Sequence, residues 1–178
     1  MARRIGDLLA ERVAGGFVGR ERELSGLVRC LEPGGPVVVL VHGIAGIGKS
    51  SLLGAFASRA RQQGATVVRL DCRVIEPTER GFLHELGAAL GGGGRSVEQA
   101  AQRLGHLGER VVLALDTYEV FRLLDAWLRR EFVPALGESV RVMFFGREAP
   151  VAAWLATPGW QGLVRSVALG PLETREAV

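Results

Sequence analysis

Asparagine is missing from this sequence altogether, and lysine occurs once, at Lys49. The lack of asparagine excludes the Asn-Lys-x-Asp motif with which GTPases select guanine, so guanine specificity by that route is ruled out. Of 22 basic residues, the other 21 are arginines. An ammonium on a flexible stem differs from a planar guanidinium in size and hydration, so the single lysine marks a position where arginine does not substitute.

Cysteine and long apolar runs are also scarce. Cys30 and Cys72 have no second Cys or His at metal-ligand spacing, which favours two reduced, buried thiols over a disulfide or a zinc site. Apolar runs such as Val37 to Val41 are far too short to span a bilayer, and the N-terminal stretch has no signal-peptide core. We therefore expect one soluble, cytoplasmic domain over residues 1–178, with residues 1–16 as an N-terminal extension.

A strong excess of one charge sign is lacking as well. The formal net charge is +3, and the arginines are interleaved with acidic residues, as in Gly19 to Glu23. Such mixing is typical of a solvated face and not of a basic patch. Nucleic acid is therefore not an expected partner of this domain.

What is present is an alternation of apolar runs with segments of helical spacing. This pattern predicts an α/β fold of three layers, a parallel sheet with helices on both faces. The five expected strands are Pro36 to His42, Ala65 to Asp71, Arg110 to Leu115, Val140 to Phe145 and Leu163 to Leu169. The fifth strand is the most polar, because it contains Arg165 and Ser166, and we expect it at a sheet edge.

Helical spacing recurs between the expected strands. The expected helices are Leu24 to Leu31, a segment that begins near Lys49 and ends before Gly64, Phe82 to Leu90, Val97 to Leu107, and one with Val120, Phe121, Leu124 and Leu128 on its apolar face. Trp154 and Trp160 lie beside prolines, where we expect them to anchor the core.

The strongest motif is Gly43-Ile44-Ala45-Gly46-Ile47-Gly48-Lys49-Ser50, which matches G-x-x-x-x-G-K-[ST] between an expected strand and an expected helix. Glycines in such a loop let backbone amides surround phosphate oxygens at a helix N-terminus. Lys49 is expected to reach the β- and γ-phosphates, and the Ser50 hydroxyl to ligate Mg²⁺. The alternative is a glycine-rich turn that binds nothing, and the complete pattern with its flanks favours Mg-ATP.

A carboxylate follows the apolar strand that ends at Leu115. Asp116 is expected to hold Mg²⁺ close to the P-loop, through water. A strand-end aspartate also serves as a helix cap in many proteins, and the presence of the P-loop favours the metal role.

Two further side chains join Lys49 as catalytic candidates. Glu119 is expected either to orient the hydrolytic water as a base or to cap a helix N-terminus, and its spacing from Asp116 fits both roles. Arg147 ends an expected strand, where it is placed to sense a γ-phosphate. The alternative for Arg147 is a surface ion pair with Glu148.

Together these motifs resemble those of the signal-transduction ATPases with numerous domains (STAND), relatives of the AAA+ ATPases and of the NB-ARC and NACHT switches. The resemblance runs from Phe17 to the C-terminus. It implies the P-loop NTPase sheet order 5-1-4-3-2, with ATP or ADP and Mg²⁺ as ligands. It also implies that Asp116 is the Walker B metal residue, and that Arg147 is the sensor arginine. The nucleotide-binding residues assigned by the motifs and the resemblance are Val18, Gly19, Arg20, Gly43, Ala45, Gly46, Ile47, Gly48, Lys49, Ser50 and Ser51.

One departure from the related AAA+ pattern affects the expected activity. Thr117 stands where AAA+ proteins have glutamate after the Walker B aspartate, so slow or absent hydrolysis is expected, with Glu119 as the candidate substitute. The segment Leu169-Gly170-Pro171-Leu172 is similar to the family's exit into a helical lid. Residues 171–178 are therefore expected to begin that lid.

The leading hypothesis is an ATP-binding switch that hydrolyses slowly, whose ATP and ADP states bias protein partners or self-association through regions outside this chain. A non-hydrolysing interaction or scaffold module is the first alternative, and Thr117 favours it. A small-molecule kinase is the second, and the adenine-side motif at Val18 to Glu21 argues against it.

Overall fold

The computed structural model describes residues 19–92 and 95–171, and the N-terminal extension 1–16 therefore lies outside the described residues. Its sheet has five strands in the order β2-β3-β4-β1-β5, and every neighbouring pair is parallel. The strands are β1 (Val38–His42), β2 (Thr66–Asp71), β3 (Val111–Asp116), β4 (Val140–Gly146) and β5 (Val164–Ala168). Read from the other edge, this is the order 5-1-4-3-2, so the expected order is confirmed. Each strand lies within two residues of its expected bounds.

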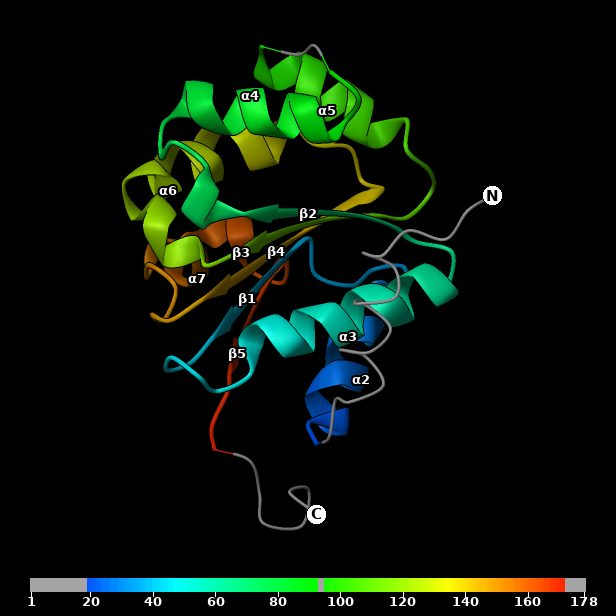
Figure 1. The fold of residues 1–178 in the computed structure, drawn as a ribbon, viewed down its shortest axis with the longest axis vertical. Helices are drawn as coiled ribbons and strands as arrows, with labels where there is room; N and C mark the ends of the chain where they lie inside the picture. Colours follow the sequence, from blue (N-terminus) through cyan, green and yellow to red (C-terminus); the bar gives the residue numbers. More distant parts are fainter. Residues whose placement is uncertain (1–18, 93–94, 172–178) are drawn as a thin grey trace.

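Helices cover both faces of the sheet (Figure 1). The α-helices are α2 (Glu21–Arg29), α3 (Lys49–Gln62), α4 (Glu79–Ala89), α5 (Val97–Gly105), α6 (Asp125–Trp127) and α7 (Ala153–Ala156). Helices α2 and α3 lie on one face, and α4, α5 and α6 lie on the other. Strand β1 serves both cores because its side chains alternate: Val39 and Val41 pack with α2 and α3, whereas Val38 and Leu40 pack with the α4 side. The three-layer prediction is confirmed.

Side-chain caps set the starts of α4 and α5. Thr78 Oγ1 accepts a hydrogen bond from the Gly81 amide at 3.0 Å, and Ser96 Oγ accepts one from the Gln99 amide at 3.3 Å. Each cap satisfies an amide of the first turn that has no partner within its helix. Helix α4 therefore begins at Glu79, three residues before the expected start at Phe82.

The segment after β3 differs from the expected single helix. It consists of the 3₁₀-helix η2 (Tyr118–Leu124), α6, the π-helix η3 (Leu128–Phe132) and the 3₁₀-helix η4 (Val133–Ala135). A 3₁₀-helix has three residues per turn, so Phe121 and Leu124 share the buried face, whereas Val120 is 39% exposed. The expectation that Val120 belongs to the apolar face was wrong, because it assumed α-helical periodicity.

Several smaller expectations are confirmed. Cys30 and Cys72 are free and buried, and burial raises the pKa of both thiols. Trp154 is fully buried, and Trp160 packs against it with ring centroids 5.1 Å apart. Strand β5 lies at the sheet edge. Within the described part of the chain, no helix has the length and apolar character needed to cross a membrane.

The remaining 3₁₀ segments are short. They are η1 (Cys72–Val74), which follows β2, and η5 (Pro158–Trp160), which precedes β5. Asp71 caps η1, because its carboxylate accepts from the Arg73 amide at 3.0 Å. The same carboxylate pairs with the Arg73 guanidinium at 2.6 Å, and this hydrogen-bonded partner lowers the pKa of Asp71.

Candidate functional site

The loop between β1 and α3 turns at two glycines with left-handed backbones. Gly46 has φ 76° and Gly48 has φ 95°, values that L-residues with a side chain adopt only under strain. Gly43 is required for a different reason: a Cβ atom there would lie 2.9 Å from the carbonyl oxygen of Leu169, at the end of β5. The two fixed glycines of the motif, Gly43 and Gly48, and the additional Gly46 therefore each have a physical role in shaping this loop.

The N-terminus of α3 faces this loop and is not capped by a side chain. Gly48 is the N-cap residue and forms no side-chain cap bond, so the first-turn amides of this 14-residue helix are available to an external acceptor. Together with the helix dipole, such amides form an anion-binding site. Ser50 and Ser51 lie in this first turn and are exposed.

Lys49 folds back over its own loop. Its ammonium donates to the carbonyl oxygens of Gly43 at 2.6 Å and Ile44 at 2.8 Å. Burial lowers the pKa of Lys49 and Arg147 lowers it further, while the carboxylates of Glu119 and Asp116 act in the opposite direction. A phosphate group would replace two neutral carbonyls with charged acceptors, which strengthens the hydrogen bonds of the ammonium.

Asp116 accepts from three donors. Its Oδ1 accepts from the Ser50 hydroxyl at 3.2 Å and from the Thr117 amide at 2.9 Å, and its Oδ2 accepts from the Arg69 guanidinium at 2.6 Å. Asp116 is 5% exposed. Ser50 and Asp116, the two residues expected at the metal, are thus brought together.

Arg69 was missed by the sequence analysis. It lies in β2, two residues before Asp71, which is the register partner of Asp116 on β3. Residues two apart in a strand point to the same face, so Arg69 is placed to reach the carboxylate on the neighbouring strand. The available signal was a charged residue inside the otherwise apolar run from Val67 to Leu70.

The oxygen atoms of Ser50 and Asp116 suit a cation that takes its other ligands from phosphate and water. Within residues 19–92 and 95–171, no group of three or more His, Cys, Asp or Glu side chains is placed to hold a metal ion. The hydroxyl of Ser50 and the Oδ1 atom of Asp116 are hard oxygen ligands that lie 3.2 Å apart. Mg²⁺ typically uses one or two such protein ligands and completes its shell with phosphate and water, so these residues fit that ion.

Glu119 and Arg147 are paired with each other. The Arg147 guanidinium donates to Glu119 Oε1 and its backbone amide donates to Oε2, both at 3.1 Å. The Glu119 side chain is 18% exposed, against 62% for Arg147. Glu148, the alternative partner of Arg147, pairs instead with Arg122 at 2.9 Å. Glu119 therefore stands beside the end of β4, and Thr117 occupies the N-cap position of η2.

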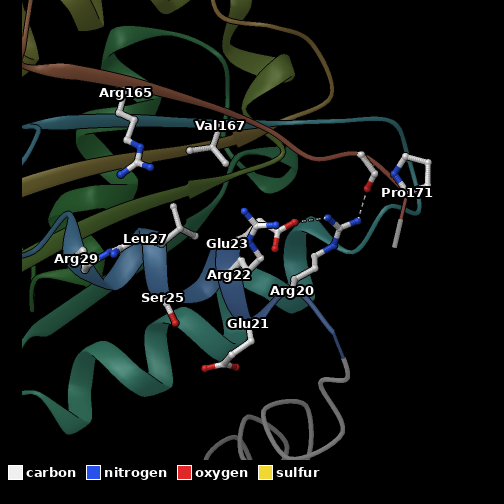
Figure 2. Close-up of a pocket in the computed structure, with 12 residues that line it drawn as sticks. Arg20, Glu21, Arg22, Glu23, Ser25, Leu27, Arg29, Arg165, Val167 and Pro171 are labelled. Carbon is white, nitrogen blue, oxygen red and sulfur yellow. Dashed lines mark hydrogen bonds and ion pairs between the residues drawn. The ribbon is translucent and has the colours of Figure 1, made fainter. Parts of the chain in front are cut away.

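Arg20 joins the start of α2 to the P-loop and to the end of β5. Its guanidinium donates to the carbonyl oxygens of Ile47 at 3.0 Å and Gly170 at 2.6 Å, and to Glu23 at 3.1 Å. Figure 2 shows it between α2 and the segment that contains Pro171. Arg20 is 3% exposed, and its φ of 62° follows the left-handed Gly19. Val18, expected beside them, lies outside the described residues.

A groove of about 750 Å³ extends from Arg20 along α2 and β5 (Figure 2). Pro171 lines its end and is also the last described residue, so residues 172–178 of the expected lid segment 171–178 fall outside the described part of the chain. Arg20 lines the groove and donates to Ile47 of the P-loop, and the sequence predicts the adenine at the motif that contains Arg20.

The parallel sheet of this order, the glycine loop and the paired Ser50 and Asp116 define a P-loop nucleotide-binding domain. Residues 16–145 match the family model described as AAA ATPase domain, which is more than half of the chain. The chain therefore belongs to the AAA ATPase domain family. The expected identity as a P-loop domain of the AAA+ group is confirmed.

Solved structures of the same fold come from larger proteins. The chain is similar to the ORC1 protein of Aeropyrum pernix, solved in complex with DNA (21% identity, TM-score 0.66, 95% of this chain and 50% of that one). It is also similar to Drosophila ORC bound to DNA (15%, TM-score 0.57, 94% and 49%) and to C. elegans PCH-2 (15%, TM-score 0.52, 90% and 46%). The chain spans about half the length of these proteins. No curated protein matches it.

Proposed function

We propose that this chain is the ATP-binding domain of a STAND-type signalling ATPase, a switch that binds Mg-ATP and hydrolyses it slowly. The observation that carries the proposal is the hydrogen bond of 3.2 Å between Ser50, at the start of α3, and Asp116, at the end of β3. This contact places a hydroxyl and a carboxylate, two kinds of metal ligand, next to the glycine loop and the uncapped N-terminus of α3. Binding of phosphate together with a divalent cation requires such an arrangement.

In this proposal each part of the loop contacts a different part of the nucleotide. The amides from Gly46 to Ser51 surround the phosphates, and Lys49 exchanges its carbonyl partners for β- and γ-phosphate oxygens. Gly19 and Arg20 stand on the adenine side, next to the groove along α2. Residues 171–178 are proposed to begin the helical lid that the family resemblance implies.

Ser50 and Asp116 are the proposed Mg²⁺ ligands. The ion would supply positive charge that neutralises the phosphate oxygens. Arg69 holds Oδ2 of Asp116 and leaves Oδ1 directed toward Ser50. Arg69 is therefore a positioning residue, and its positive charge weakens the attraction between Asp116 and a cation.

The ion pair between Glu119 and Arg147 is the proposed switch element. In the closed pair, the candidate base is held away from water by two hydrogen bonds. A γ-phosphate is a competing anion for the exposed Arg147 guanidinium, so ATP releases Glu119 whereas ADP does not. Slow hydrolysis then follows from the competition between the phosphate and Glu119, and from Thr117 in place of a second carboxylate.

A non-hydrolysing interaction module is the second candidate, and the same ion pair favours it. If the pair stays closed with ATP bound, no base is released and the nucleotide has a purely structural role. Partners in either case are proteins, or further copies, contacted through regions outside this chain.

Single-turnover hydrolysis of radiolabelled ATP separates the two candidates. Slow phosphate release that is lost in Glu119→Gln supports the switch, and Glu148→Gln is the matched control because Glu148 pairs with Arg122 instead. An unchanged ATP pool, with ATP demonstrably bound, supports the non-hydrolysing module. Failure of ATP to bind at all overturns both.

A further inference from the structure

A second cavity, of about 280 Å³, lies beside the P-loop site at the carboxyl ends of β1 and β4. Its walls come from β1, β4, η2, the start of α6 and the loop 148–151. Leu40, Phe144, Pro150 and Val151 supply apolar surface, and Val151 is 44% exposed at the rim. The cavity is thus a mainly apolar recess with an open side, and none of the proposed phosphate contacts uses it.

The carboxylate of Asp125 lies in the lining of this cavity and is 4% exposed. Its Oδ1 accepts from the Tyr118 hydroxyl at 2.6 Å and from the Trp154 indole at 2.8 Å. The nearby carboxylate also raises the pKa of Tyr118, after burial, the larger cause. These contacts fix the orientation of the carboxylate and leave its second oxygen, Oδ2, for other partners.

The Oδ2 atom keeps some solvent-accessible surface, and the residue that carries it lines the cavity. Among the described residues, no donor forms a hydrogen bond to Oδ2. Oδ2 is also not one of the fully buried polar atoms that lack a hydrogen-bond partner. The described residues also provide no cation within ion-pair distance of Asp125. A carboxylate buried in this way carries a large desolvation cost that a bound cation offsets.

The other two carboxylates of the lining are each paired with an arginine. Glu119 lines the cavity, and its carboxylate is turned toward Arg147. Glu148 and Arg122, both exposed, neutralise each other. Asp125 is therefore the carboxylate of the lining that has no ionic partner among the described residues, and the apolar walls favour an organic cation over a strongly hydrated inorganic ion.

We infer that this cavity binds a small organic ammonium ion, whose N–H groups donate to Asp125 Oδ2 and whose apolar body packs against Phe144, Pro150 and Val151. The inference does not require the proposed nucleotide function, although Glu119 belongs to both sites. The negative charge of the Asp125 carboxylate supplies specificity for a cation, and the apolar walls of the cavity supply contact area for its body.

The test uses benzylamine, which is an ammonium ion at neutral pH, and the indole N–H resonances of the three tryptophans in ¹⁵N spectra of the whole chain. The Trp154 signal reports directly because its N–H donates to the same carboxylate. Benzylamine is expected to shift this signal saturably, whereas benzyl alcohol and benzoate are not. A saturable shift is also expected in Lys49→Ala, which separates this site from the nucleotide site.

Variants identify the contact. Asp125→Asn keeps an oxygen acceptor for Tyr118 and Trp154 but removes the charge, and it is expected to weaken benzylamine binding about tenfold or more. Val151→Phe, at the exposed rim, narrows the cavity without touching the buried contacts and is expected to weaken binding too. Arg165→Ala, in the groove along α2, is the control and should bind normally.

Three results would overturn the inference. They are the lack of a saturable Trp154 shift with benzylamine, an equal shift with benzyl alcohol, and unchanged binding by a folded Asp125→Asn variant. If Asp125→Asn does not fold, Val151→Phe decides, and unchanged benzylamine binding in that variant contradicts the site.

Discussion

Glu119 and Arg147 are joined twice, once through the guanidinium of Arg147 and once through its backbone amide, with both contacts at 3.1 Å. The sequence predicts the two roles separately, with Glu119 as a candidate base and Arg147 as a candidate γ-phosphate sensor. Their pairing means that one cannot engage a nucleotide without affecting the other. The guanidinium is the exposed half of this pairing, whereas the amide belongs to the backbone directly after β4.

The first prediction concerns Arg147→Ala. Loss of one charge-assisted contact to the γ-phosphate is expected to weaken ATP binding about tenfold or more and to leave ADP binding nearly unchanged. Calorimetry gives the Kd values of ATP and ADP for the wild-type chain and the variant, and their ratio measures the discrimination between the two nucleotides. Arg122→Ala, which removes a neighbouring exposed arginine, is the control. Equal losses for ATP and ADP would remove the sensing role.

The second prediction concerns the metal. Arg69→Gln removes a positive charge that lies 2.6 Å from Asp116, so the Mg²⁺ concentration at half-saturation of ATP binding is expected to fall severalfold. Arg73→Gln is the matched control, because Arg73 pairs with Asp71 on the adjacent segment. A higher Mg²⁺ requirement in Arg69→Gln would show that positioning of Asp116 outweighs the charge effect.

The third prediction concerns pH. Because burial lowers the pKa of Lys49, this side chain binds more protons in the unfolded chain than in the folded one between that pKa and 10.5, so its own contribution to the free energy of unfolding rises with pH in this window. The raised pKa values of Cys30, Cys72 and Tyr118 act in the opposite sense. ATP affinity falls with pH in this window, since the ammonium that holds phosphate is lost as pH rises through the lowered pKa. The chain has a single lysine, so its ¹³C-methylated side chain gives one NMR signal to titrate. A pKa equal to that of the same label in urea contradicts the prediction.

The fourth prediction concerns stability. Arg20→Ala removes hydrogen bonds to Ile47, Gly170 and Glu23 from a nearly buried guanidinium, which is expected to lower the free energy of unfolding by about 2 kcal/mol or more. Arg22→Ala, on the exposed side of α2, should change it by less than about 0.5 kcal/mol. Urea denaturation measures both. Similar small changes would show that Arg20 does not fasten the loop.

Much of the fold could be predicted because buried parallel strands are continuous apolar runs. Strand β3, from Val111 to Asp116, is buried throughout and was located to within one residue. The segment from Tyr118 to Phe132 could not be predicted, because its period changes from 3₁₀ to α to π within fifteen residues and no fixed template matches it.

The candidate site also has a part that the sequence predicts and a part that it does not. The P-loop residues are contiguous, so their spacing carries the geometry, and the expected meeting of Ser50 with Asp116 is observed. Contacts between residues that are far apart in the sequence leave no such spacing pattern. The ion pairs of Arg69 with Asp116 and of Arg147 with Glu119 depend on strand order and register, and spacing alone gives neither.

Calorimetric titration of ATP with Mg²⁺ into the whole chain and into Lys49→Ala tests the central claim most directly. The account predicts saturable binding to the wild-type chain, and a loss of about a hundredfold or more in the folded variant, because an ammonium bound to phosphate is removed. Arg110→Ala, an exposed position at the opposite end of β3, should bind normally. Equal ATP affinity in the wild-type chain and in Lys49→Ala would contradict a phosphate site at this loop.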